Sequence, residues 1–184
     1  KKKYTKENLL KELLNSVFDS NKIEELFNNE TNLNESNTQG ETYLHLCAKN
    51  GCLESAKWLI NKGADIEVKT KGSNTPLFYA ALSNSRALTR FLIAKGANVD
   101  HTNEHKRTAL QEALIAGKRT IDILFEHTKI LNNTDIYGNN LIFDAVANGS
   151  KELIEKVISN KAIDINIVNK EGHTILHKEA VLKN

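Results

Sequence analysis

The chain has 184 residues, of which 40% are hydrophobic and 26% are charged, so it is long and apolar enough to bury a core. Its 25 basic and 23 acidic residues give a formal net charge of +2, which is too balanced to indicate nucleic acid or an anionic membrane as a partner. No apolar run is long enough for a transmembrane helix. The two cysteines are too few for a disulfide scaffold, which favours a reducing compartment.

The N-terminal part of the chain predicts two helices. Residues 5–19 are expected to form an amphipathic helix, because apolar residues recur there at helical spacing with charged residues between them. A shorter helix is expected at about residues 22–29. Its Leu26 lies 33 positions before Leu59 in the next part of the chain. Residues 1–41 are therefore predicted to be a divergent N-terminal capping repeat, since terminal repeats are usually atypical.

One seven-residue pattern recurs along the rest of the chain at a nearly fixed period. Its copies begin at Thr42, Thr75, Thr108, Asn140 and Thr174, which are 33, 33, 32 and 34 positions apart. A fixed period in this range is typical of proteins built from stacked repeats. We predict repeat 1 at 42–74, repeat 2 at 75–107, repeat 3 at 108–139, repeat 4 at 140–173 and a C-terminal half-repeat at 174–184, within one domain.

Each full repeat is predicted to contain two helices. The initial Thr or Asn is placed to cap the first helix by accepting a backbone N–H. Pro76 suits the first helical turn of repeat 2, where no N–H is needed. Gly51 is expected to end the first helix of repeat 1 and Gly63 the second, because glycine tolerates a left-handed turn.

The sequence resembles the ankyrin repeat family over roughly residues 9–182. The resemblance rests on the period, on the Thr-Pro-Leu type of helix start at Thr75, and on two Gly-Ala-Asp/Asn corners at 63–65 and 96–98. Loops that run from Asn or Asp to Gly recur at 37–40, 135–138 and 169–172. The resemblance implies an all-α fold, an ankyrin-repeat solenoid of antiparallel helix pairs with projecting β-hairpin-like loops.

The chain departs from the family pattern in the middle copies. The signature histidine is kept in the first and last copies, as His45 and His177, and is replaced in the three between them. The replacements are Phe78, Gln111 and Phe143. The loop glycine is replaced by Ser73 and Lys106. The polar network between adjacent loops that the resemblance implies is therefore predicted to be weaker in the middle of the array.

No catalytic or metal-binding arrangement is evident. His173 and His177 have the spacing of two zinc ligands on a helix, but His173 precedes the helix and no HExxH pattern is present. His101 and His105 flank a loop tip and have no third ligand. No phosphate-binding loop, nucleophile elbow or carboxylate pair occurs. We expect no bound metal, no cofactor and no enzymatic activity.

Three further residues are interpreted as structural. Cys47 and Cys52 lack CxxC spacing and are expected to be buried, inert thiols. Trp58 occupies a repeat position filled by Phe91 and Leu124 in the next two copies, which predicts a core residue.

Basic residues near two loops and one turn are interspersed with acidic ones, which favours a solvated surface over an electropositive patch for an acidic partner.

Binding is expected where the copies differ, at the loop tips and along the inner helices. Repeat arrays present an extended concave face, along which Leu82, Ile115 and Tyr137 would offer apolar groups that can anchor a partner. The alternative is that Leu82 and Ile115 pack under their own loops. The predicted partner-binding residues are Gln39, Glu41, Lys49, Asn50, Lys71, Asn74, Leu82, Ser83, His105, Arg107, Ile115, Tyr137, Asn139 and Asn148.

These patterns predict a non-catalytic protein–protein interaction module, or scaffold, that binds another protein rather than nucleic acid. We expect it to be monomeric and cytoplasmic, with no membrane span and no signal peptide. The alternative is the targeting region of a larger enzyme, or of an effector that an intracellular bacterium secretes into the host-cell cytoplasm. The absence of methionine and the partial last repeat lead us to expect a fragment of a longer protein.

Overall fold

The computed structural model describes residues 5–27 and 31–177, and the chain divides into two compact units. Unit 1 extends to Asn98 and unit 2 begins at Val99. Unit 1 contains the helices α1 (Lys6–Leu13), α2 (Ser20–Leu26), α3 (Tyr43–Lys49), α4 (Leu53–Asn61), α5 (Pro76–Leu82) and α6 (Arg86–Ala94). Unit 2 contains α7 (Ala109–Ile115), α8 (Ile121–His127), α9 (Leu141–Asn148) and α10 (Lys151–Ser159).

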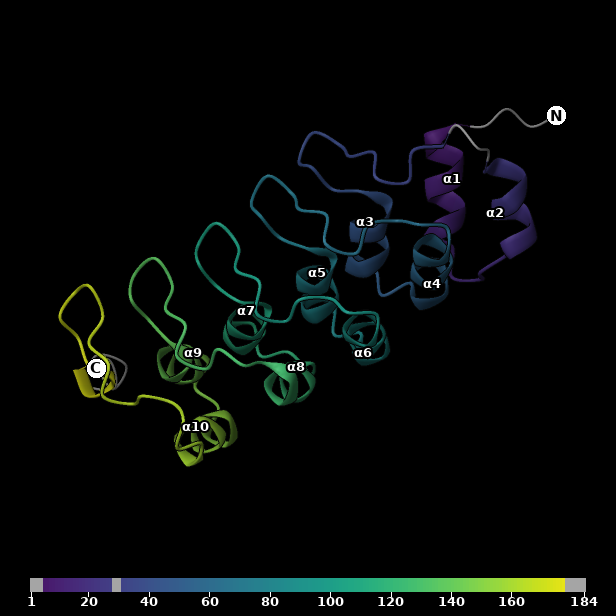
Figure 1. The fold of residues 1–184 in the computed structure, drawn as a ribbon. Coiled ribbons are helices and arrows are strands. Elements are labelled where there is room, and N and C mark those ends of the chain that lie inside the picture. Colours follow the sequence, from purple (N-terminus) through teal and green to yellow (C-terminus); the bar gives the residue numbers. More distant parts are fainter. Residues whose placement is uncertain (1–4, 28–30, 178–184) are drawn as a thin grey trace. The chain divides into compact units, whose positions relative to one another are not determined.

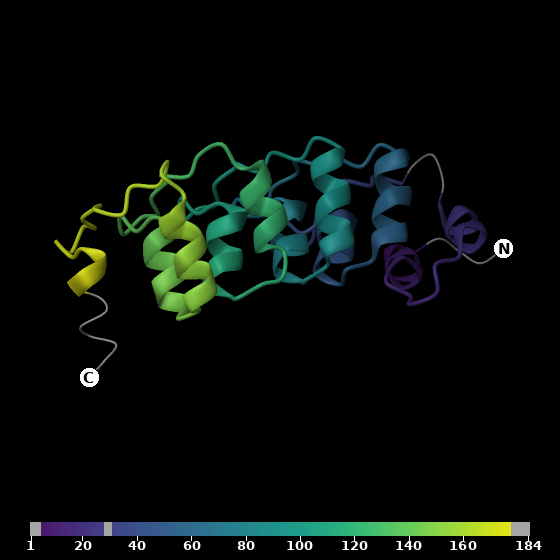
Figure 2. The same ribbon diagram turned by 90° about the horizontal axis from the view of Figure 1, so that it is seen from below.

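The helices of each unit are arranged in sequential pairs. Unit 1 contains the pairs α1–α2, α3–α4 and α5–α6, and unit 2 contains α7–α8 and α9–α10 (Figures 1 and 2). A loop projects from the helices before α3, α5, α7 and α9 (Figure 1). The described residues contain no strand, only single antiparallel bridges such as the one between Ser36 and Thr42. The expected all-α class of paired helices is confirmed.

These helices have only 7 to 9 residues, too few to be stable alone, so packing must hold them. In unit 1, Leu44 and Leu77 are the second residues of α3 and α5, at equivalent repeat positions, and are each 1% exposed. Leu110 and Ile142 have the same place and exposure in unit 2. Small residues follow on the same helices, such as Ala48, which is 0% exposed. Large and small residues at fixed repeat positions therefore build the core of each unit.

The predicted helix at 5–19 is wrong in its length. Helix α1 ends at Leu13, and the next helix begins at Ser20 rather than at about residue 22. The side-chain oxygen of Asn15 accepts the backbone N–H of Val17 at 3.2 Å, and this local turn competes with the helix. Val17 is consequently 72% exposed, although helical periodicity placed it on the apolar face. Helix α2 ends at Leu26, and the last two residues of the predicted helix, 28 and 29, lie outside the described residues.

The loops that begin with asparagine or aspartate share one internal hydrogen-bond pattern. In unit 1, Asn37 Oδ1 accepts the backbone N–H groups of Gln39 and Glu41, both at 2.9 Å. In unit 2 the same double acceptance recurs at the equivalent positions, which are occupied by Asn103, Asp135 and Asn169. A side chain that accepts two N–H groups of its own loop closes the turn without help from neighbouring elements.

The loops also need one residue with a left-handed backbone. Glycine fills this position at Gly40, with φ of +81°. Ser73 and Lys106 replace it in the next two loops and keep φ of 61° and 57°, so the turn survives the substitution. A non-glycine residue in this conformation costs about 1–2 kcal/mol, which the loop hydrogen bonds must outweigh.

Gly40 has a second constraint, the close approach of the following loop. A Cβ at Gly40 would lie 2.9 Å from Lys71 N and 3.0 Å from Thr70 Cα, both backbone atoms. Gly63 also has positive φ, but a Cβ there would meet nothing within 4 Å. We expect Gly40→Ala to lower the free energy of unfolding of unit 1 by about 3 kcal/mol and Gly63→Ala by about 1 kcal/mol.

Urea denaturation of both glycine variants, followed by the fluorescence of Trp58, measures this difference because the single tryptophan lies in unit 1. Equal losses in the two variants would show that the contact between the loops contributes nothing beyond backbone conformation.

A further column of side chains links successive repeats within each unit. In unit 1, Asn34 accepts the backbone N–H of Asp65 and Glu67 accepts that of Asn98, both at 2.8 Å. In unit 2, Asp100 accepts the N–H of Lys129 at 3.0 Å, and Asn132 accepts that of Asp164 at 2.7 Å. The four acceptors stand 33, 33 and 32 positions apart, so each repeat carries one side chain that holds the next.

Candidate functional site

Unit 1 holds eight of the predicted partner-binding residues. Leu82, at the end of α5, is 37% exposed, and Lys49 and Asn50 at the end of α3 are also exposed. Gln39 and Lys71 are exposed in the loops. The remaining three are half-buried, and they are Glu41, Asn74 and Ser83. The structure thus leaves an apolar group, Leu82, accessible at the C-terminal end of α5.

Unit 2 holds the other six. Tyr137 is 54% exposed in the loop before α9, and His105 is exposed in the loop before α7. Arg107, Ile115 and Asn148 are half-buried. Asn139 is only 8% exposed, and its Oδ1 accepts Asn169 Nδ2 at 3.0 Å. Its side chain therefore offers little surface to a partner and joins two loops instead.

Sequence reasoning missed one repeat column that lies next to these residues. The fourth residue after each capping position is Leu46 in repeat 1, and its counterparts are Tyr79, Glu112 and Asp144. In unit 1, Tyr79 donates to Glu41 Oε1 at 3.0 Å. In unit 2, Glu112 accepts from Asn103 at 3.0 Å and Asp144 accepts from Gln111 at 3.1 Å. The column changes in every repeat, and that variation was the available signal.

Glu41 is the centre of the polar contacts on the inner surface of unit 1. Its carboxylate accepts from Asn37 at 2.8 Å and from Tyr79, and it lies 3.7 Å from Lys49 Nζ. The hydrogen bond from Asn37 and that from Tyr79, with the charge of Lys49, hold the pKa of Glu41 below its usual range despite burial. Burial, followed by the hydrogen bond to Glu41, raises the pKa of Tyr79 to about 12. At neutral pH the pair is a phenol and a carboxylate.

His45 connects two loops of unit 1 in one tautomer. Its Nδ1 accepts the backbone N–H of Thr42 at 3.1 Å, so the ring proton resides on Nε2, which lies 3.0 Å from the carbonyl oxygen of Asn74. Burial lowers the pKa of His45 and favours this neutral form, although its contact with the Asn74 carbonyl and the charge of Glu41 act in the opposite direction. The signature histidine is thus a structural link between a helix start and the next loop.

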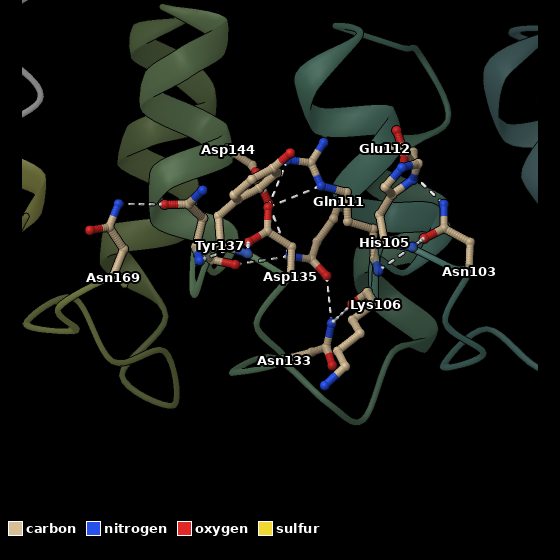
Figure 3. A network of polar contacts seen from close by, with 12 residues as sticks. Asn103, His105, Lys106, Gln111, Glu112, Asn133, Asp135, Tyr137, Asp144 and Asn169 are labelled. Atoms are coloured by element: carbon tan, nitrogen blue, oxygen red, sulfur yellow. Dashed lines mark hydrogen bonds and ion pairs between the residues drawn. The ribbon is translucent and has the colours of Figure 1, made fainter. Parts of the chain in front are cut away.

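The prediction of a weaker polar network in the middle copies is wrong at Gln111. This residue, which is labelled in Figure 3, occupies the repeat position of His45. Its Oε1 accepts the N–H of Thr108 at 3.2 Å. Its Nε2 donates to Asp144 at 3.1 Å and lies 3.5 Å from the Asn139 carbonyl. The oxygen and nitrogen of the glutamine amide extend about as far from the backbone as the two imidazole nitrogens. Glutamine can therefore also accept the N–H of the capping residue and contact the carbonyl of the next loop.

Arg107 and Asp135 form the ion pair of this network. Arg107 donates from Nε at 3.1 Å and from Nη2 at 2.7 Å to Asp135 Oδ2, while Asp135 Oδ1 accepts two backbone N–H groups of its loop. The Asp135 side chain is fully buried and that of Arg107 is 21% exposed. Burial opposes ionisation of Asp135, but the bonds from Arg107 and from the backbone outweigh it and lower its pKa.

Asp144 is the buried acid next to this pair. It is 3% exposed at the start of α9, and burial raises its pKa to about 7, although the hydrogen bond from Gln111 and the charge of Arg107 act in the opposite direction. The carboxyl group therefore changes protonation near neutral pH. Among the described residues, no buried side-chain nitrogen or oxygen lacks a hydrogen-bond partner, so the network is complete as it stands.

The candidate metal and redox residues have structural environments. The rings of His173 and His177 stack at 5.9 Å between centroids, and His177 Nδ1 accepts the N–H of Thr174 at 3.2 Å. No group of three or more histidine, cysteine or acidic residues in the described ranges could hold a metal ion. Cys47 is buried and Cys52 half-buried, and burial raises the pKa of both thiols.

Trp58 is part of a core contact that holds the first helix pair of unit 1. It is 8% exposed, meets Phe27 edge-on at 5.4 Å, and donates from Nε1 to Glu24 at 2.9 Å. Lys62 lies 2.8 Å from the same carboxylate. The predicted core role of Trp58 is confirmed.

None of the helices in the described part of the chain is long and apolar enough to span a membrane.

Comparison with known proteins agrees with this architecture. A family model described as "Ankyrin repeats (many copies)" matches residues 44–93, and one described as "Ankyrin repeats (3 copies)" matches residues 69–135. The two matches together cover half of the chain. The chain belongs to the ankyrin repeat family.

Similar proteins come from viruses and animals. A putative ankyrin repeat protein of Acanthamoeba polyphaga mimivirus, L371, is 28% identical over 79% of this chain and 18% of its own length. The mouse B-cell lymphoma 3 protein homolog is 36% identical over 42% of this chain and 17% of its own length. A putative ankyrin repeat protein of fowlpox virus, FPV223, is 28% identical over 66% of this chain and 85% of its own length. The chain thus spans under a fifth of the mimivirus and mouse proteins.

Proposed function

We propose that this chain is a protein-binding module whose contact surface lies at the loop tips and along the inner helices α3, α5, α7 and α9. Ankyrin repeats generally mediate protein–protein interaction and are typically non-enzymatic, which supports the class of function. The observation that carries the location is the exposure of large apolar side chains there, Leu82 at 37% in unit 1 and Tyr137 at 54% in unit 2. Exposed aromatic and aliphatic groups are the usual anchors of a protein interface.

Aspartate substitution of these two residues tests the location. Leu82→Asp and Tyr137→Asp each add a charge where the proposed interface must lose water, so each is expected to weaken binding of the partner at least tenfold. Both side chains are exposed, so the fold should tolerate the change. Ile115 is half-buried, so Ile115→Asp would also affect folding and is not used for this test.

Ile158→Asp is the matched control, because Ile158 is 50% exposed on α10, the second helix of its pair, which the proposed surface does not include. The partner is first captured with the wild-type chain and identified by mass spectrometry, and the affinity of the purified pair is then measured by calorimetry. Normal affinity of a well-folded Leu82→Asp and Tyr137→Asp double variant, or equal loss in the Ile158→Asp control, would contradict the proposed surface.

A second proposal is that the array is the binding region of a larger protein. The observation that favours it is the small share of the mimivirus and mouse relatives that the chain matches. The finer version, an effector delivered to a host cytoplasm, and the expected monomeric and cytoplasmic state remain predictions. Size-exclusion chromatography with light scattering, and imaging of the full-length gene product in its own cell, test them.

A further inference from the structure

Unit 1 contains a pocket at the N-terminal end of its inner surface. The pocket has a volume of about 180 Å³ and is bounded by α1, by the loop before α3 and by α3 itself. Its lining is mostly apolar, and the apolar part comes from Leu10 on α1 and from Tyr43 and Leu46 on α3. Leu46 begins the repeat column whose next member, Tyr79, binds Glu41. The pocket is therefore continuous with the surface proposed to bind a partner.

The charged part of the lining is acidic. Three carboxylates contribute to it, those of Glu7, Glu35 and Glu41, against one ammonium group, that of Lys6. Asn37 and Tyr79 hold Glu41 by hydrogen bonds, and Glu7 makes no ion pair within the described ranges. The Lys6 ammonium pairs with Glu35. Internal cations thus already pair with two of the three carboxylates, Lys6 with Glu35 and Lys49 with Glu41, and Glu7 is left for an incoming charge.

We propose that this pocket binds a basic side chain, lysine or arginine, of the partner protein. Such a side chain has an aliphatic stem and a charged end. The stem fits against Leu10, Tyr43 and Leu46, and the cation then reaches the carboxylates of Glu7 and Glu35. The proposal rests on the proposed function, and it adds the chemical class of one residue of the partner.

Lys6 gives the proposal a distinctive consequence. Because its ammonium group pairs with Glu35, it competes with an incoming cation for the same carboxylate. Removing the charge of Lys6 should therefore strengthen binding of a basic ligand, whereas removing the charges of Glu7 and Glu35 should weaken it. A purely apolar ligand carries no charge on which either change could act, so its affinity should stay nearly the same in both variants.

The test uses three capped amino acids as probes for the whole chain, the N-acetyl N-methylamides of arginine, norleucine and glutamate. Amide resonances of Leu10, Asn37 and Leu46 are followed by ¹H–¹⁵N NMR at low ionic strength, where exposed charges are least screened. We expect saturable shifts with the arginine probe, weaker shifts with norleucine and none with glutamate. Glu7→Gln with Glu35→Gln is expected to raise the Kd of the arginine probe about fivefold, and Lys6→Gln to lower it about twofold.

Glu25→Gln is the matched control, because Glu25 is an exposed acid on α2 outside the pocket lining. An arginine probe that binds no tighter than norleucine, or whose Kd is the same in all variants, would overturn the proposal. Concentration-dependent shifts of the same amides without any probe would show that a second copy of the chain fills the pocket, and would also overturn it. The probes report on the pocket alone, so this outcome is separate from the effect of Leu82→Asp on the partner.

Discussion

Asp135→Asn is expected to lower the free energy of unfolding of unit 2 by about 2–3 kcal/mol, because it removes the partner of a largely buried guanidinium. The new Nδ2 would face the Nε and Nη2 donors of Arg107, which now lie 3.1 and 2.7 Å from the carboxylate oxygen. The loop itself should survive the change. Asn103 and Asn169 show that an asparagine Oδ1 at this repeat position accepts the same two backbone N–H groups.

Two further variants separate the ion pair from the loop. Asp135→Ala also deletes the acceptor for the loop N–H groups, so its cost should rise to about 4 kcal/mol. In an Arg107→Gln background, Asp135→Asn should cost markedly less than in the wild type, since the charge to be neutralised is gone. Amide hydrogen exchange in α7 and α9 reads the stability of unit 2. If the Asp135→Asn variant were as stable as the wild type, hydration would stabilise the Arg107 guanidinium as much as the ion pair with Asp135 does.

Asp144→Asn is expected to stabilise unit 2 above pH 7 and to remove most of its pH dependence. In the folded chain the pKa of Asp144 is about 7, above its usual 3.8. The folded state therefore binds a proton more tightly than the unfolded state. The resulting stabilisation is complete below the unfolded pKa, and it is lost as the pH rises through the folded value. Between pH 5 and 8 the loss corresponds to about 2–3 kcal/mol.

Asparagine retains an acceptor for Gln111 and carries no charge at any pH, so the stability of the variant should hardly change over this pH interval.

The opposite pH dependence of stability is expected in unit 1. Burial lowers the pKa of His45, so the unfolded state takes up the proton first, and unit 1 should lose stability as the pH falls below about 6.5.

Amide hydrogen exchange of the wild-type chain at a series of pH values, analysed separately for α3 and α9, measures the pH dependence of the stability of both units. A wild-type unit 2 that is no less stable at pH 8 than at pH 5 would mean that Asp144 stays ionised in the fold.

The fold was predictable because its signals are local. Thr75 followed by Pro76, and the glycines of the loops and corners, determine where helices start and turns occur, and the period follows from counting them. The exception is local as well. Asn15 makes a turn that ends α1 early, and helical periodicity alone does not detect such a competing side-chain bond.

The candidate site was predictable only in part. Variation between repeats identified exposed residues such as Leu82 and Tyr137. It also selected Asn139, which is buried, because variation at a position does not distinguish a free surface from a contact between loops that differs from repeat to repeat. The column of Tyr79 and Asp144 shows the same variation and was overlooked.

The sequence by itself determined the repeat length, the helix pairs and the family, because the signals for helix starts and turns each lie within a few positions and recur along the chain. Only the tertiary structure decided which polar residues meet. Gln111 and Asp144 stand 33 positions apart, and Arg107 and Asp135 stand 28 apart. Stacking one repeat on the next brings each pair within hydrogen-bond distance and removes water from it. That burial turns an ordinary aspartate, Asp144, into a group that titrates near neutral pH.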